Sequence, residues 1–267
     1  VGSWEPNTQY GPFTNVNWGQ GYPYNKSLDP IYCGGAYKQP WTGCMATAIA
    51  QIMAYYRYPS IIQGIKFEWD TMLTSSSAYY LSPSGITQVA SLMKVIGTGI
   101  ATKYACEGSS SEIDKANAWY NNIGYSSDGV QNYNLSTVVS SLAAKRPVLI
   151  RGYSLKTTTT SGWWIFSSSS TYYSEGHAWV IDGYLKRQRK VNYNLVVYMG
   201  SQKLAVQPMS TYEYDEYVRC NYGWSGSSNG YYQSGVFTTN VGPVTLKSGT
   251  IGNYQYDVKI LPNIRPR

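Results

Sequence analysis

One cysteine and the single histidine carry the chemistry that this sequence could perform. Cys44 follows Gly43 at the start of a segment rich in helix-forming residues, and His177 is the only histidine among 267 residues. A helix N-terminus favours a thiolate over a thiol, and a nearby imidazole can accept and return the proton. Gly43 would leave room for a substrate backbone beside the sulfur. The pair predicts a nucleophilic thiol with a histidine base, whereas either residue alone is more often an ordinary core or surface side chain.

Two further segments hold residues that such a thiol would need. Gln20 lies upstream, and its side-chain N–H together with the Cys44 backbone N–H could bind an oxyanion. Downstream of His177, Asn221 could hold the imidazole tautomer, or Trp224 could orient and shield the ring. The alternatives are a polar loop residue for Gln20 and a glycine-rich turn with a core tryptophan for the second segment. Which of Asn221 and Trp224 orients His177 is open.

Four sequence blocks follow one another along the chain. They read Trp18-x-Gln20-x-x-Pro23-Tyr24-Asn25, Gly43-Cys44-x-Ala46-Thr47-Ala48, Gly176-His177-Ala178-x-Val180-Ile181-Asp182-Gly183-Tyr184 and Asn221-x-Gly223-Trp224. In this order they resemble the streptopain family of papain-fold cysteine peptidases. The 133 positions from Cys44 to His177 also fall within the roughly 130–150 that are typical of papain-type enzymes. The resemblance implies Cys44 as nucleophile, His177 as proton carrier and Gln20 as oxyanion donor.

The resemblance also implies how substrates and partners would bind. Residues 104–111 are similar to a family loop that lines the substrate cleft, so Ser109, Ser110 and Gly176 are expected to touch the substrate backbone. The expected partners are protein or peptide substrates and the N-terminal pro-domain of a secreted zymogen. No metal or organic cofactor is expected. The stretch 185–217 is longer than the resemblance leads us to expect, and it predicts an added hairpin.

The first half of the chain predicts the helices that would position the thiol. Apolar residues at helical spacing, with Thr42 as the cap, predict a buried helix that starts around Cys44 and stops before Pro59. Further helices are expected over residues 87–96, 111–121 with Ser111 as the cap, and 135–144. The first 35 residues, rich in Gly, Pro, Asn and Tyr, predict an extended system of surface loops.

The second half predicts the strands that would position the histidine. Strands are expected over residues 147–152, 177–184, 194–199, 213–221 and 230–237. His177, Trp179 and Ile181 would share one face of their strand. The tract 153–176 has no clear period and is expected to be a functional loop or partly disordered.

These elements predict an α+β protein with a papain-like, two-lobed fold. A single catalytic domain would span residues 1–267. Residues 1–145 would form a mainly helical lobe carrying Cys44, and residues 146–267 a β lobe carrying His177. The active-site cleft would lie between the lobes.

The amino-acid composition excludes several other classes of function. Only 13% of the residues are charged, and the basic residues behind the net charge of +7 are scattered, so nucleic-acid binding is not predicted. The one basic cluster, 186–190, is most simply interpreted as a solvated hairpin turn. No apolar run approaches the roughly 18 residues of a membrane span. Four cysteines without a C-x-x-C pair and one histidine do not suit a structural zinc site. The four cysteines are equally compatible with one disulfide bond and with a remaining reactive thiol. The start at Val1 and the richness in Tyr, Trp, Ser and Gly predict a processed chain that is secreted or belongs to the cell envelope.

The functional hypothesis is therefore a secreted cysteine endopeptidase that works through a Cys44 thiolate, His177 and a thioester acyl-enzyme. One alternative is an amidase or transpeptidase that acts on cell-wall peptides with the same dyad. The other is a non-catalytic surface-binding module whose Tyr and Trp residues contact glycans or proteins.

Overall fold

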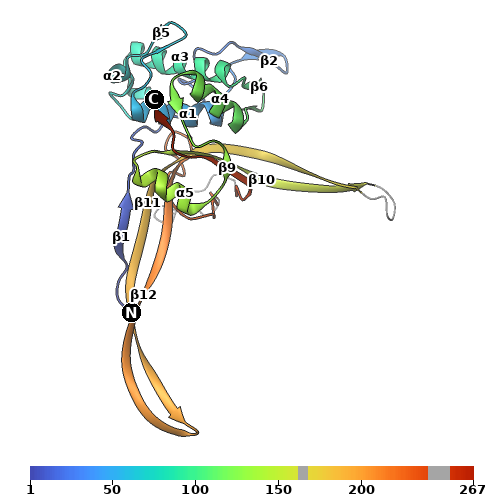
Figure 1. Ribbon diagram of the computed structural model, residues 1–267. Coiled ribbons are helices and arrows are strands. Elements are labelled where there is room, and N and C mark those ends of the chain that lie inside the picture. The colour runs from blue at the N-terminus through green and yellow to red at the C-terminus, as the bar shows by residue number, and fades with distance from the viewer. Residues whose placement is uncertain (162–167, 240–252) are drawn as a thin grey trace.

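Helices gather at one end of the molecule and a long antiparallel sheet extends from them (Figure 1). The computed structural model describes residues 1–161, 168–239 and 253–267. The helices are α1 (Cys44–Tyr56), α2 (Trp69–Met72), α3 (Pro83–Gly99), α4 (Ile113–Asn122) and α5 (Leu135–Ala143), with the 3-10 helix η1 (Ala78–Tyr80). The strands are β1 (Glu5–Tyr10), β2 (Ile31–Cys33), β3 (Ala36–Lys38), β4 (Ile61–Ile62), β5 (Ile65–Lys66), β6 (Lys103–Ala105), β7 (Gly108–Ser110), β8 (Tyr125–Ser126), β9 (Gln131–Asn132), β10 (Val148–Ser161), β11 (Ser168–Met199), β12 (Gln202–Asn221), β13 (Gly230–Gln233), β14 (Tyr256–Leu261) and β15 (Arg265–Pro266). Helices followed by antiparallel strands confirm the predicted α+β class.

Helix α1 is the buried helix that the sequence predicts. Every residue from Met45 to Ala54 is buried, which the alternation of alanine with Ile and Met permits on all faces. The helix is capped by Gly43, whose φ of 89° is in the left-handed region that glycine adopts at little cost. The predicted cap Thr42 was wrong. Thr42 lies one residue before the N-cap position. Its hydroxyl lies 3.0 Å from the Thr47 hydroxyl and caps no backbone N–H of the first turn.

The other predicted helices also form, with different ends. Helix α3 is longer than predicted because Ser82 caps it through the Gly85 N–H, and α5 is capped by Asn134. Helix α4 starts two residues after Ser111, whose hydroxyl donates to the Ile100 carbonyl rather than capping the helix. No helix in the described ranges is both long and apolar enough to cross a membrane.

Strand β11 runs through the middle of the main sheet, whose order is β13-β12-β11-β10-β14-β9, with β1 also paired to β11. Its side chains alternate between two buried clusters. Ala178 and Val180 join the cluster around α1, whereas Trp179 and Ile181 join the cluster on the other face, against α5. The imidazole of His177 stacks against Trp179 on that second face, as the alternation predicts.

Beyond this buried part, β10 and β11 continue as a hairpin where the sequence predicted a loop. The two strands stay paired from Tyr153 opposite Gly176 out to Ser161 opposite Ser168. The loop prediction for 153–176 was wrong because both faces of the hairpin are largely exposed, so no apolar alternation marks it. Its Thr and Tyr residues nevertheless favour extended backbone. Residues 162–167 lie outside the described part of the chain.

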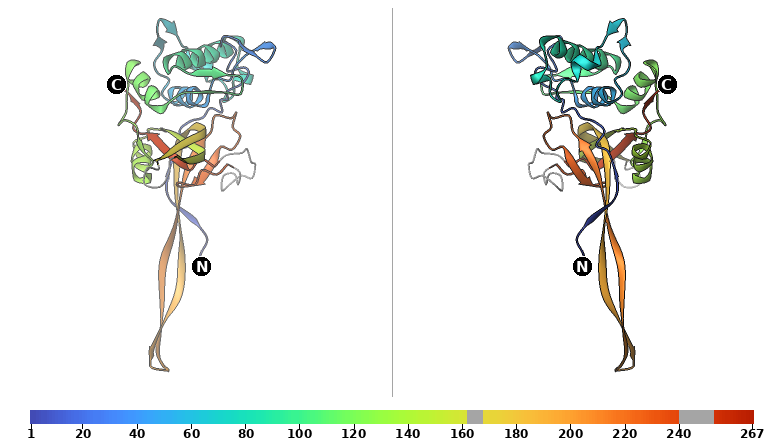
Figure 2. Two further views of the ribbon diagram at one scale, coloured as in Figure 1. Left: turned by 90° about the vertical axis from the view of Figure 1, so that its right-hand side faces the viewer. Right: turned by 90° about the vertical axis from the view of Figure 1, so that its left-hand side faces the viewer.

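The stretch 185–217 forms the predicted hairpin, and it projects far from the helices as a ribbon of β11 and β12 (Figure 2). The basic cluster 186–190 lies in this ribbon near the body of the protein, not in a turn. Ion pairs cross from one strand to the other, joining Lys186 to Glu216, Arg187 to Asp215 and Arg189 to Glu213. The positive charges are thus largely matched by acidic residues on β12.

The first 35 residues are more ordered and more buried than predicted. Strand β1 extends the sheet along β11, and the chain then crosses to the helices, where Val16, Trp18 and Tyr24 are buried in the cluster around α1. Pro6 and Asn7 in β1 have low strand propensity, and the sequence therefore did not predict this strand. This crossing segment delivers Gln20 to the junction of helices and sheet.

Candidate active site

A cleft of about 630 Å³ brings together the predicted nucleophile, base and oxyanion donor. Its walls include Cys44 from the start of α1, His177 from β11 and Gln20 from the crossing segment. The predicted substrate contacts Ser109 and Gly176 line it too. The chain therefore collects at one place residues that are far apart in the sequence.

Of the other predicted site residues, Trp224 lines this cleft, whereas Ser110 and Asn221 do not. Trp224 lines the main cleft, whereas Ser110 lines a smaller adjoining cavity of about 110 Å³ that also reaches Cys44 and Gly176. Asn221 lines neither of these two cavities.

The Cys44 thiol is subject to opposing influences. Burial raises its pKa, and the backbone N–H groups of Ala178, Met45 and Cys44 itself act in the opposite direction by favouring the thiolate. Ala178 directly follows His177, so the sulfur faces the backbone of the strand that carries the base. The effect of burial is the larger of the two, so the net direction of the shift in the Cys44 pKa is upward.

Gly43 has a different role from the one predicted. A Cβ atom on this residue would lie 3.3 Å from the Ser109 carbonyl oxygen, so Ser109 and not a substrate occupies the space beside it. Ser109 is itself fixed, since its hydroxyl donates to the Trp41 carbonyl at 2.7 Å. Glycine is needed here for its positive φ and for this close approach between α1 and β7.

The imidazole of His177 is held by a main-chain carbonyl. Its Nε2 lies 2.8 Å from the Tyr222 carbonyl oxygen, and the residue as a whole is only 5% exposed. A carbonyl oxygen only accepts, so Nε2 carries the hydrogen and Nδ1 of the neutral ring is free to accept a proton. Burial lowers the pKa of His177 to about 4, opposed by the Tyr222 carbonyl.

Aromatic rings enclose this imidazole. The ring centroid of Trp224 lies 4.6 Å away, that of Tyr254 5.3 Å, that of Tyr222 5.8 Å and that of Trp179 6.1 Å. Trp224 is the nearest of these and lines the cleft, so it stands between the hydrogen-bonded ring and solvent. This is the shielding position that the sequence offered as one alternative.

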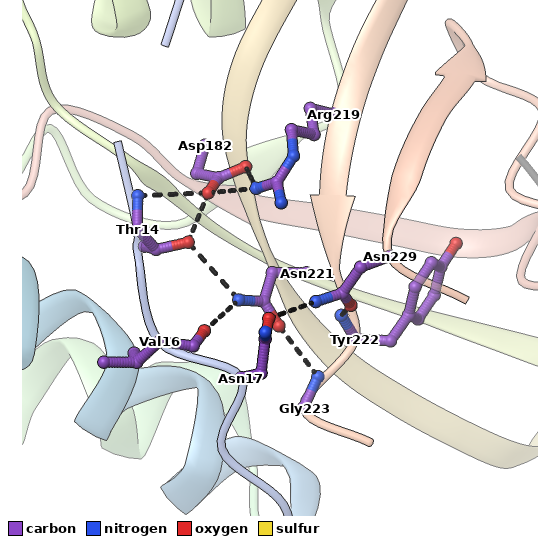
Figure 3. Close-up of polar contacts among 9 residues, drawn as sticks. All are labelled: Thr14, Val16, Asn17, Asp182, Arg219, Asn221, Tyr222, Gly223 and Asn229. Atoms are coloured by element: carbon purple, nitrogen blue, oxygen red, sulfur yellow. Dashed lines mark hydrogen bonds and ion pairs between the residues drawn. The ribbon is translucent and has the colours of Figure 1, made fainter. Parts of the chain in front are cut away.

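Asn221 holds the chain and not the imidazole (Figure 3). Its amide nitrogen donates to the Val16 carbonyl at 2.8 Å and to the Thr14 hydroxyl at 3.3 Å, and its oxygen accepts from the Gly223 N–H at 3.3 Å. These contacts tie the crossing segment to the end of β12. Sequence reasoning missed the Tyr222 carbonyl because a backbone acceptor leaves no signature in residue type.

A buried carboxylate extends the same network (Figure 3). Asp182 is fully buried, accepts from Arg219 at 2.6 and 2.8 Å, and accepts from both the backbone N–H and the hydroxyl of Thr14. Burial raises the pKa of Asp182, and Arg219 and Thr14 oppose that shift. Asn229 completes the network by accepting from the Tyr222 N–H at 2.9 Å. Together these contacts fix the peptide whose carbonyl binds His177.

Gln20 has a free donor at the cleft. Its backbone carbonyl accepts from the Thr42 N–H at 3.0 Å, which fixes it close to the start of α1. In the described part of the chain its side-chain amide has no hydrogen-bond partner, so its N–H groups are available to a ligand.

The four cysteines divide into one disulfide and two thiols. Cys33 and Cys106 are bonded, which joins the β2–β3 hairpin to the β6–β7 hairpin, and Cys44 and Cys220 are free. Cys220 is buried, and burial holds the pKa of its thiol far above the ordinary value. Within the described ranges, no three His, Cys, Asp or Glu side chains come together as metal ligands.

A cysteine at the start of a buried helix that faces a strand histidine across a cleft between helices and sheet defines the class of papain-like cysteine peptidases. The family model of the Peptidase C10 family matches residues 18–67 and 61–232. The chain belongs to this family, which confirms the resemblance found in the sequence.

Individual relatives agree with this assignment. The chain is 25% identical to the thiol protease/hemagglutinin PrtT of Porphyromonas gingivalis over 94% of its own length, and 22% identical to streptopain of Streptococcus pyogenes over 82%. It spans 26% of the first protein and 53% of the second, so both relatives are considerably longer.

Solved structures share the fold. The active interpain A cysteine protease of Prevotella intermedia matches with a TM-score of 0.57 at 19% identity, covering 96% of this chain and 95% of that one. A fragment of prointerpain A from the same organism matches with a TM-score of 0.59 at 18% identity, covering 100% of this chain and 77% of that one. The papain-like fold that the sequence predicted is confirmed.

Proposed function

We propose that this chain is a secreted cysteine endopeptidase in which Cys44 attacks the peptide bond and His177 moves the proton. The observation that carries the proposal is the placement of His177. Its Nε2 is bonded to the Tyr222 carbonyl, so Nδ1 is its free acceptor, and its ring shares the cleft with Cys44 and Gln20.

The reaction would begin from a neutral pair. Burial favours both the protonated thiol of Cys44 and the neutral imidazole of His177. As the sulfur approaches a peptide carbonyl, its proton would pass to Nδ1, and the N–H groups around the sulfur would stabilise the thiolate formed. Two opposite charges then lie side by side in a poorly solvated site, where their attraction is strong.

The remaining steps follow from the groups around the cleft. The tetrahedral oxyanion would accept hydrogen bonds from the Gln20 side chain and the Cys44 backbone N–H. His177 would return its proton to the leaving amine, which leaves a thioester on Cys44. Water, deprotonated by the same imidazole, would attack the thioester, and Cys44 would recover its proton as the acid product leaves.

We extend the proposal to the way the protein is made. Its similarity to a prointerpain A fragment, part of which lies outside the match, supports an N-terminal pro-domain that precedes this chain in a zymogen. Secretion accords with the Cys33–Cys106 disulfide, because such bonds persist mainly in oxidising compartments.

Labelling and turnover test the proposal together. A peptidyl thiol-reactive inhibitor should label Cys44 alone by mass spectrometry, and the protein should digest casein. Cys44→Ala should abolish both while keeping the circular dichroism spectrum and melting temperature close to those of the wild type. Cys220→Ala, which removes the other free thiol, should keep both activities. Cleavage of cell-wall peptides but not casein would indicate the amidase alternative, and the absence of inhibitor labelling would indicate a binding module.

A further inference from the structure

The substrate cleft has a simple charge pattern. Among the described residues that line it, Glu107 is the only Asp, Glu, Lys or Arg. The protein as a whole carries a net charge of +7, so a negative cleft is not a consequence of overall composition. Glu107 is therefore the carboxylate that can give the main cleft charge selectivity, whereas the smaller adjoining cavity is lined by one acidic residue, Glu112, and one basic residue, Arg151.

Glu107 is held in place by its neighbours in sequence. It follows Cys106, which is bonded to Cys33, in the tight turn where Ala105 pairs with Gly108. The side chain itself is exposed, and no ion pair or hydrogen bond within the described residues engages it. A fixed backbone with an unpaired carboxylate is suited to binding a cation supplied by a ligand.

Aromatic rings line the same cleft with unusual exposure. The exposed fractions are 63% for Tyr22, 49% for Trp41 and 57% for Tyr79. A guanidinium or ammonium group is attracted to the face of such a ring, and its aliphatic stem packs well on an apolar surface. A carboxylate together with exposed rings offers both kinds of contact that an arginine or lysine side chain makes.

We propose that Glu107 is a specificity-determining residue that selects peptides with a cationic side chain near the scissile bond. Arginine should be preferred over lysine, because its planar group can stack on a ring while it pairs with the carboxylate. The inference rests on the proposed peptidase function, but it concerns binding in the cleft and can be measured without turnover.

Matched peptides test the idea. Each member of the set carries either arginine or its uncharged isostere citrulline at one position within three residues of the scissile bond. At the best position, Glu107→Gln should lower kcat/KM for the arginine peptide about three- to tenfold, mainly through KM, and leave the citrulline peptide unchanged. Glu68→Gln is the control, since it removes one exposed carboxylate that pairs with Lys66 and lines neither cavity beside Cys44. Raising the salt concentration should shrink the arginine preference of the wild type only.

Binding to the Cys44→Ala protein separates this inference from the proposed function. If no peptide is cleaved but arginine peptides still bind this protein more tightly than citrulline peptides, and Glu107→Gln removes the difference, the proposed reaction fails and the selectivity stands. An arginine-to-citrulline ratio that is the same in the wild type and in the Glu107→Gln variant, or a ratio near one at every position, would overturn the role of Glu107.

Discussion

Nε2 of His177 lies 2.8 Å from the carbonyl oxygen of Tyr222, so a main-chain acceptor and not a side chain fixes the tautomer of the base. A peptide carbonyl cannot be titrated and cannot rotate away while its peptide is held. Asn221 accepts from the Gly223 N–H of that same peptide, and Asn229 accepts from the Tyr222 N–H of the peptide before it. The orientation of the imidazole therefore depends on the network of Figure 3, which holds the backbone at Tyr222, the residue whose carbonyl binds Nε2.

The low pKa of His177 predicts an unusual pH profile. Because burial lowers this pKa from an ordinary 6.5 to about 4, the imidazole stays neutral and able to accept a proton down to about pH 4. We expect the acid limb of kcat/KM that reports His177 to lie near pH 4. As the only histidine, it gives an unambiguous NMR titration. An imidazole that titrates at or above pH 6.5 would instead indicate a resting thiolate–imidazolium pair.

The same shift predicts how stability depends on pH. Between pH 6.5 and 4 the unfolded chain binds a proton on His177 that the folded chain does not, so the free energy of unfolding should fall as the pH falls through this window. The full effect is about 3 kcal/mol, and nothing is lost above pH 6.5. Urea unfolding of the wild type and of His177→Ala across this range measures it. A stability difference between the two proteins that does not vary with pH would contradict the prediction.

Trp224 and Asn221 should give different phenotypes when removed. Trp224→Ala opens the imidazole to water, so the His177 pKa should rise toward 6.5, and Trp224→Phe should largely prevent that rise. Asn221→Ala leaves the buried Val16 carbonyl without its partner, which should cost about 1–3 kcal/mol of stability with little change in the His177 pKa. NMR titration and urea unfolding distinguish the two. A large pKa change in Asn221→Ala alone would reverse the assignment.

The sequence revealed the reacting groups better than their supports. Cys44 and His177 stand in long blocks with a helical or alternating pattern, and such local patterns predict both element type and buried face. The crossing segment that holds Trp18 and Gln20 has no period, because its burial depends on contacts with distant residues such as Asn221. The hairpin over residues 153–176 was missed for the opposite reason, since a strand with two exposed faces has no apolar alternation to detect.

Gln20 should act on the oxyanion and not on the thiol. In Gln20→Ala, kcat should fall about 10²- to 10³-fold with KM nearly unchanged, because the donor contributes mainly when charge develops on the carbonyl oxygen. Alkylation of Cys44 by iodoacetamide forms no oxyanion, so its rate should not change. Gln20→Glu replaces the donor by acceptors and should be at least as impaired. A loss of less than about threefold in kcat would remove Gln20 from the oxyanion site.

The Cys33–Cys106 disulfide should support both the fold and the cleft. It closes a loop of 73 residues, so the double variant Cys33→Ser/Cys106→Ser should lose about 2–4 kcal/mol of unfolding free energy. Glu107 and Ser109 follow Cys106 directly into the cleft wall, so a freed β6–β7 hairpin should also raise KM for peptides. The alkylation rate of Cys44 should stay the same, because α1 and β11 are built without the bond. Denaturant unfolding, peptide kinetics and iodoacetamide labelling of the one variant measure the three effects, and an unchanged KM would mean that the Ser109 contact with Trp41 alone holds the wall.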